Sequence, residues 1–249
     1  MALSLRLKGP EGAKVALFLH PFALSGACWD DLLERCAAAG IRAAALDAPG
    51  FGQAAPLGRA LEMEALATLA RDALDQLGAQ QAAIIGCSMG GYAALAFARL
   101  FPERLRALGL LCTRAGADSP EAKERREAQA QAALTQGPEA VTAPLARKLL
   151  APGCALDLQP LFAQATAQGV ADALRGMALR PDSSPLLARI RVPTLVVAGE
   201  FDQLMLAADT AALARGIAGA MLEVIPGAGH LAFLERPALV AAKILELLE

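Results

Sequence analysis

The chain lacks the residue patterns that mark several large classes of proteins. Its 249 residues include 23 Lys and Arg against 25 Asp and Glu, a formal net charge of -2, so no basic excess attracts nucleic acid or anionic lipid. The five cysteines are scattered without a CxxC pair, which favours neither a disulfide framework nor a zinc site. There is no GxGxxG and no Walker loop, and we expect no metal, nucleotide or flavin cofactor.

Long uninterrupted apolar segments are lacking too. The N-terminus, MALSLRLKGPEGAK, has no basic start followed by an apolar stretch and a cleavage site, so we expect a cytoplasmic protein. The stretch between Asp75 and Arg99 carries no charge and is long enough to span a bilayer, but glutamines and glycines interrupt it. We therefore expect a small-molecule substrate, with neither nucleic acid nor membrane as partner; the oligomeric state stays open.

Short apolar runs alternate with longer segments rich in Ala and Leu, which is typical of strands and crossover helices around a mostly parallel sheet. The length suits one large α/β domain. Strands are predicted near residues 3–7, 15–19, 41–46, 82–85, 107–111, 194–198 and 221–225, and helices near residues 26–39, 61–77, 89–100, 207–215 and 237–248. The carboxyl ends of such strands share one edge, where ligands bind in open α/β sheets.

This alternation breaks between residues 113 and 190, where no β-run is evident. We expect a helical cap, or lid, over residues 114–188, inserted into a core formed by residues 1–113 and 189–249. The alternative is extra helical packing without a gating role.

Gly86-Cys87-Ser88-Met89-Gly90 fits GxSxG and lies between a predicted strand and a predicted helix. A turn this tight needs small flanking residues, and its strain exposes the serine hydroxyl at the helix N-terminus. We predict that Ser88 is a nucleophile; the alternative is a helix N-cap.

A serine hydroxyl needs a base near neutral pH, and only two histidines are present. His230 follows the last predicted strand on a glycine-rich loop and is the candidate general base. Asp202, on the loop after residues 194–198, is the candidate acid that orients it, in the chain order Ser, Asp, His. Glu200 and, more weakly, Asp118 are rival acids.

Two backbone N–H groups must converge on the oxyanion that forms during acyl transfer. Met89 should supply one, and Phe22 the other, because the adjacent Pro21 has no N–H. Phe22 and Met89 are thus expected in the oxyanion hole and in substrate binding, with His20 supporting this loop by hydrogen bonds. Cys87 should point away from the site into the core.

The His20 loop, DAPGFG, GCSMGG, GEFD and GAGH occur in the order found in α/β-hydrolases, and the chain resembles that superfamily over nearly its full length. Residues 113–129 and 180–202 resemble small esterases and lactonases of the 3-oxoadipate enol-lactonase-like group. The resemblance implies an α/β-hydrolase fold with an eight-stranded core and a helical cap. It argues against dehalogenases and epoxide hydrolases, which use an aspartate nucleophile. Pro21 departs from the usual His-Gly pair.

The expected activity is hydrolysis of a carboxylic ester or lactone through an acyl-enzyme. The alternatives that stay open are a thioester or carrier-bound ester hydrolase, a cofactor-free perhydrolase, a carbon-carbon bond hydrolase, and a non-catalytic ligand-binding protein on the same fold. Five basic residues of the predicted cap could dock an acidic partner, although such charges usually form a solvated helix face: Arg125, Arg126, Arg147, Lys148 and Arg175.

Overall fold

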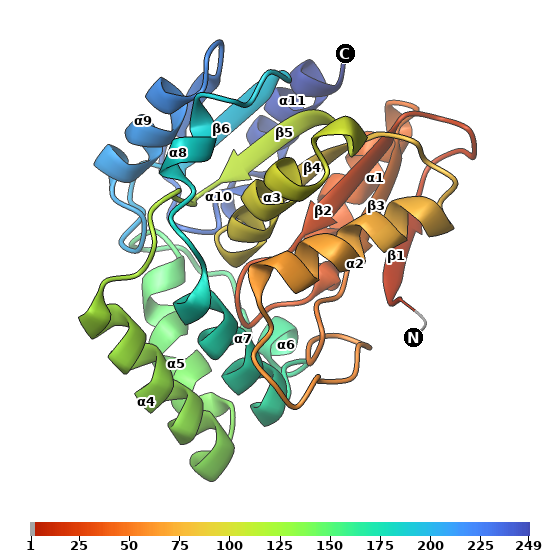
Figure 1. Ribbon diagram of the computed structural model, residues 1–249. Coiled ribbons are helices and arrows are strands. Elements are labelled where there is room, and N and C mark those ends of the chain that lie inside the picture. Colours follow the sequence, from red (N-terminus) through yellow and green to blue (C-terminus); the bar gives the residue numbers. More distant parts are fainter. Residues whose placement is uncertain (1–2) are drawn as a thin grey trace.

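Seven strands form one sheet in the computed structural model, which describes residues 3–249 (Figure 1). The order across the sheet is β1-β3-β2-β4-β5-β6-β7, and only β1 runs antiparallel to its neighbour. The strand bounds are β1 Leu5–Lys8, β2 Val15–Leu19, β3 Arg42–Leu46, β4 Ala82–Cys87, β5 Leu105–Leu111, β6 Thr194–Gly199 and β7 Met221–Ile225. Residues 1–2, at the start of the predicted core, lie outside the described part.

The sheet has one strand fewer than the eight that the resemblance implies. In the described residues, a single strand, the antiparallel β1, precedes β2. The predicted β-runs otherwise become strands, and β4 and β5 extend beyond their predicted ends. All residues of β2 and β4 are buried, as expected for central strands covered on both faces.

Helices cover both faces of this sheet. In Figure 1, α2 and α3 cross in front of the strands, and α1 and α11 lie behind them, where α11 packs on β5 and β6. The bounds of the helices outside the β5–β6 connection are η1 Gly26–Trp29, α1 Asp30–Ala38, α2 Met63–Gln76, α3 Met89–Leu100, η2 Pro102–Arg104, α9 Ala207–Gly216, α10 Ala232–Glu235 and α11 Pro237–Leu248. None of the helices within residues 3–249 has the length and apolar character of a membrane span.

The connection from β5 to β6 contains helices and no strand element: α4 Pro120–Gln136, α5 Glu139–Leu149, α6 Gln159–Phe162, α7 Ala167–Leu179 and α8 Ser184–Leu187. Helices α4 to α7 gather beyond the carboxyl end of β5 in Figure 1, whereas α8 packs against α9. Two glycines bring α7 onto the core. A Cβ on Gly169 would lie 2.5 Å from the Cα of Gly50, and one on Gly176 would lie 1.6 Å from the carbonyl oxygen of Leu61.

Trp29 joins distant parts of the chain within the core. Its ring is fully buried, lies 5.2 Å from that of Phe18 on β2, and stacks on Phe233 of α10 at 3.9 Å. The only tryptophan thus packs η1 against β2 and ties the segment after His230 to this part of the sheet.

Candidate functional site

Ser88 stands at a sharp turn between β4 and α3. Its backbone has φ 52° and ψ -111°, a strained conformation for a residue with a side chain. The turn requires glycine on both sides. A Cβ on Gly86 would lie 2.1 Å from the carbonyl oxygen of Gly90, and one on Gly90 would lie 2.0 Å from that of Leu19. The Ser88 side chain makes no cap hydrogen bond to α3, so a role as helix N-cap does not explain why serine stands at this position.

His230 and Asp202 form a buried pair at the ends of β7 and β6. The Nδ1 atom of His230 lies 2.9 Å and 3.0 Å from the two carboxylate oxygens of Asp202, and their side chains are 1% and 2% exposed. Asp202 also accepts hydrogen bonds from the backbone N–H groups of Leu204 and Met205, at 2.8 Å and 3.0 Å.

These contacts determine the charge of Asp202. Burial disfavours the ionised carboxylate, but the hydrogen bond and charge of His230, with the two backbone N–H groups, outweigh it and lower the pKa of Asp202 below its usual value. Because an ionised carboxylate only accepts, Nδ1 of His230 must carry the proton. In the neutral imidazole, Nε2 is thereby left as the acceptor.

Ser88 and His230 line the same cleft, which has a volume of about 420 Å³. Helices α4, α5 and α7 of the β5–β6 connection supply much of its wall. Ser88 remains 9% exposed there. Within residues 3–249 no hydrogen bond joins the Ser88 hydroxyl to His230; such bonds are often long in unliganded sites.

Phe22 also lines this cleft, and Met89 begins α3 directly after Ser88. In the described residues, no backbone acceptor is paired with the N–H of Phe22 or of Met89. His20 supports this loop as expected: its Nδ1 lies 2.9 Å from the carbonyl oxygen of Pro21, and its Nε2 accepts from the N–H of Ala48 at 3.0 Å. Burial lowers the pKa of His20, which favours this neutral tautomer.

The rival acids are engaged elsewhere. Glu200 is exposed and accepts a hydrogen bond from the N–H of Gly227 at 2.8 Å. Asp118 is held by Arg114, Arg126 and Arg180. Neither carboxylate has His230 as a hydrogen-bond partner among the described residues.

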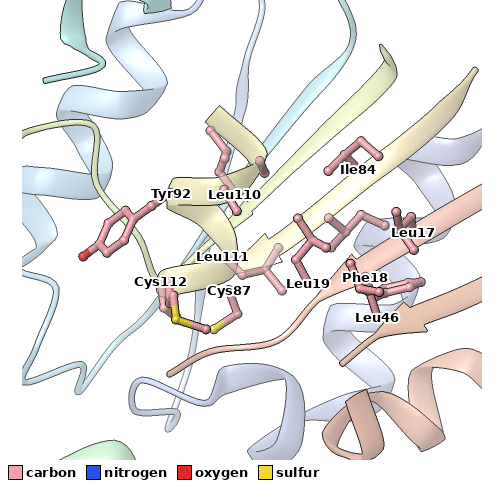
Figure 2. Packing of buried hydrophobic residues seen from close by; sticks show 14 of the residues in the cluster. Leu17, Phe18, Leu19, Leu46, Ile84, Cys87, Tyr92, Leu110, Leu111 and Cys112 are labelled. Atoms are coloured by element: carbon pink, nitrogen blue, oxygen red, sulfur yellow. The ribbon is translucent and has the colours of Figure 1, made fainter. Parts of the chain in front are cut away.

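Sequence reasoning missed Cys112 and Glu235. Cys112 has a positive φ of 45°, and its Sγ lies within 4.8 Å of a ring nitrogen of His230 and a carboxylate oxygen of Asp202. These three residues are the one potential metal-ligand group in residues 3–249, and two of them already form the hydrogen-bonded pair. Figure 2 shows Cys112 beside Cys87, whose Sγ is buried and lies 3.9 Å from the carbonyl oxygen of His230.

Glu235 fixes the loop that carries His230. Its carboxylate is buried and accepts from the N–H of Gly229 at 2.7 Å and from the N–H of Ala151, just after α5, at 2.9 Å. No motif marks either residue, because each acts through contacts between segments far apart in the sequence.

The comparisons with known proteins agree with this geometry. The chain is similar to a thermophilic esterase from Thermogutta terrifontis, solved with malate bound, with a TM-score of 0.94 and 35% identity over 99% of this chain and 92% of that one. A Bacillus subtilis (strain 168) protein that bears the name of a 2-succinyl-6-hydroxy-2,4-cyclohexadiene-1-carboxylate synthase is 29% identical over 256 residues, 97% of this chain and 92% of that protein.

A second curated relative, 3-oxoadipate enol-lactonase 2 of Acinetobacter baylyi, is 32% identical over 171 residues, which is 66% of this chain and 62% of that protein. The family model described as alpha/beta hydrolase family matches residues 16–243. With the sheet order and the strained turn between β4 and α3, this match shows that the chain belongs to the alpha/beta hydrolase family.

Proposed function

We propose that this chain is a serine hydrolase that cleaves a carboxylic ester or lactone through an acyl-enzyme. Ser88 attacks the carbonyl carbon, His230 takes its proton through Nε2 and returns it to the leaving alcohol, and Asp202 holds the imidazole in the required tautomer. Water then attacks the acyl-enzyme with help from the same base. The N–H groups of Phe22 and Met89 stabilise the oxyanion.

One observation carries this proposal. A serine in a strained conformation borders the cleft into which His230 also faces, and the other ring nitrogen of that histidine is bound to a buried carboxylate of lowered pKa. A structural serine needs neither the strain nor the adjacent acid–base pair. The similarity to an esterase and an enol-lactonase supports ester and lactone substrates.

Hydrolysis of 4-nitrophenyl esters of rising acyl length and of simple lactones tests the proposal. We expect turnover by the wild type and a fall in kcat of about 10⁴-fold or more in Ser88→Ala, since only the oxyanion donors and binding remain. Ser184→Ala, a change at an exposed serine, is the matched control and should keep the wild-type rate. Retained turnover in Ser88→Ala would refute the nucleophile assignment.

Labelling with a fluorophosphonate separates an enzyme from a binding protein on the same fold. Only an activated serine reacts, so the label should attach to Ser88 in the wild type and be absent from the Ser88→Ala variant. An unlabelled wild type that binds ligands without turnover would favour the ligand-binding alternative.

A further inference from the structure

The wall of the cleft is strongly cationic. Four basic side chains line it, from the β5–α4 loop and from α4 and α5: Arg114, Arg125, Arg126 and Lys148. The only acidic side chain in this lining is Asp118. Of the five basic residues that the sequence suggested for an acidic partner, three face the cleft, whereas Arg147 and Arg175 do not line it.

Asp118 cannot neutralise this wall, because its charge is already shared among three arginines. Its side chain is fully buried, and it accepts hydrogen bonds from Arg114 at 2.9 Å, from Arg180 at 2.8 Å and from Arg126. Burial opposes its ionisation, yet the hydrogen bonds from Arg180 and Arg126 hold the pKa of Asp118 far below its usual value. A positive surplus therefore remains around the carboxylate. The buried Nε of Arg114 has no hydrogen-bond partner among the described residues.

The other two cations, Arg125 and Lys148, are exposed and form no ion pair within residues 3–249. Glu121 lies one turn before Arg125, but its pKa is lowered mainly by a hydrogen bond with Ser119, and Arg125 contributes least. Arg175 on α7, which does not line the cleft, differs from these two cations, because Glu127 of α4 pairs with it at 2.7 Å.

Apolar side chains line the same cleft: Leu145, Leu149, Leu174 and Met177. A ligand bound there with its ester group at Ser88 can therefore contact apolar side chains as well as Arg125 and Lys148. Those two cations lack the partner that a ligand carboxylate would supply.

Given the serine hydrolase function proposed above, we infer that the substrate carries a second, ionised carboxylate, which Arg125 and Lys148 bind while Ser88 attacks the ester or lactone carbonyl. A small anionic ester fits better than an acidic carrier protein, since all four cations line the cleft that holds Ser88.

Matched pairs of esters test this inference. 4-Nitrophenyl hemiglutarate against 4-nitrophenyl valerate places the charge on the acyl part, and 3-acetoxybenzoate against phenyl acetate places it on the leaving group. For the pair whose charge meets Arg125 and Lys148, we expect the ratio of kcat/KM of the anionic ester to that of the neutral ester to fall about threefold in Arg125→Gln or Lys148→Gln and about tenfold in the double variant. Added NaCl should lower the same ratio, because exposed charges are screened.

Two neighbouring cations supply the controls. Lys123→Gln on α4 and Arg147→Gln on α5 each remove one positive charge from the same helices without touching the cleft lining, and they should leave the ratio at its wild-type value. An equal fall in these controls would assign the effect to net charge and overturn the inference.

The remaining outcomes separate this inference from the function on which it rests. Unchanged ratios for both pairs in the double variant would overturn anion recognition while Ser88-dependent hydrolysis still stood. If the double variant lowered kcat/KM only for an ester linked to an acidic carrier protein, this result would also overturn the inference, in favour of protein docking. Hydrolysis that persists in Ser88→Ala would instead remove the proposed function.

Discussion

At the scale of single residues, the proposed transfer of a proton from Ser88 to His230 requires Asp202 to stay ionised. In Asp202→Asn the amide can keep one oxygen on the N–H groups of Leu204 and Met205, but its NH₂ then faces Nδ1 of His230 and favours the wrong tautomer. We expect kcat to fall about 10⁴-fold with an unchanged circular dichroism spectrum.

Glu200→Gln is the control for this variant. The residue lies two positions earlier in the chain, is exposed, and contacts Gly227 rather than the histidine. Ester hydrolysis should stay within about twofold of the wild type. If Glu200→Gln were instead the more damaging change, the acid would have to be reassigned.

The pH dependence follows from the lowered pKa of Asp202. Burial opposes its ionisation, but His230 and the backbone N–H groups keep the carboxylate charged when the pH falls below the usual range for aspartate. Histidine is the side chain that ordinarily changes charge between pH 5 and 8. We expect kcat/KM for a neutral ester to rise with pH across this range, with a limiting slope of one proton, because the base must be deprotonated to act. A flat profile over this range would contradict a histidine base.

The spacing of motifs predicts that Ser88, Asp202 and His230 lie near one another, because each follows a strand whose carboxyl end lies at the same edge of the sheet. The structure pairs Asp202 with His230 and places His230 and Ser88 on one cleft, while their catalytic roles stay predictions. The spacing could not predict Cys112, which lacks a motif and lies near Asp202 and His230 only through the packing of β5 beside β6. The sequence suggested five basic residues for an acidic partner but could not show which of them face the cleft. Which face of α4 or α5 points to the cleft depends on how these helices pack on the core.

At the scale of secondary-structure elements, Glu235 at the end of α10 connects two segments around His230. Glu235→Gln keeps one acceptor oxygen and turns an NH₂ group toward either the Gly229 or the Ala151 N–H, which leaves that N–H unpaired. We expect a loss of about 1 to 3 kcal/mol in the free energy of unfolding and a lower kcat, because the loop that carries the histidine loses its anchor.

Thermal unfolding and kcat measured on the same samples check this. Glu246→Gln, on the exposed side of α11, removes the same charge. It should change the free energy of unfolding by no more than about 0.5 kcal/mol and kcat by no more than about twofold. Wild-type stability and rate in Glu235→Gln would show that these two hydrogen bonds do not hold the loop.

Asp118 links α4, α7 and the loop after β5 through its arginines. Asp118→Asn leaves Arg126 and the buried Arg180 without a counter-charge, and we expect a loss of about 3 to 5 kcal/mol in the free energy of unfolding near pH 7. The pKa of Asp118 is lowered in the folded chain, so its stabilisation is present above the unfolded pKa of about 3.9 and is lost as the pH falls below it.

The difference in stability between wild type and Asp118→Asn should therefore be constant from about pH 5 to 7 and shrink below about pH 4. Urea unfolding at several pH values measures it. A difference that grows toward acid pH would have the wrong sign for a carboxylate with a lowered pKa.

At the scale of the whole molecule, the helices between β5 and β6 share the core of the sheet. Val170 and Leu174 of α7 belong to the same buried cluster as β2 and β4, and Gly169 and Gly176 bring α7 into backbone contact with residues 50 and 61. A separately folding cap would need a boundary with few contacts. We expect these helices to unfold together with the sheet.

The fluorescence of Trp29 reports on the unfolding of the sheet, since it is the only tryptophan, lies against Phe18 of β2 and stacks on Phe233. The proposed ester hydrolysis takes place in the cleft that α4, α5 and α7 help to form. In increasing urea, the loss of activity and the shift of the emission should therefore share one midpoint, which far-UV circular dichroism should reproduce.

Replacing Gly176 by Val would force α7 away from Leu61 and should move the loss of activity to a lower urea concentration than the emission shift. Separate midpoints in the wild type would contradict cooperative unfolding, because they would show that these helices detach while the sheet stays folded.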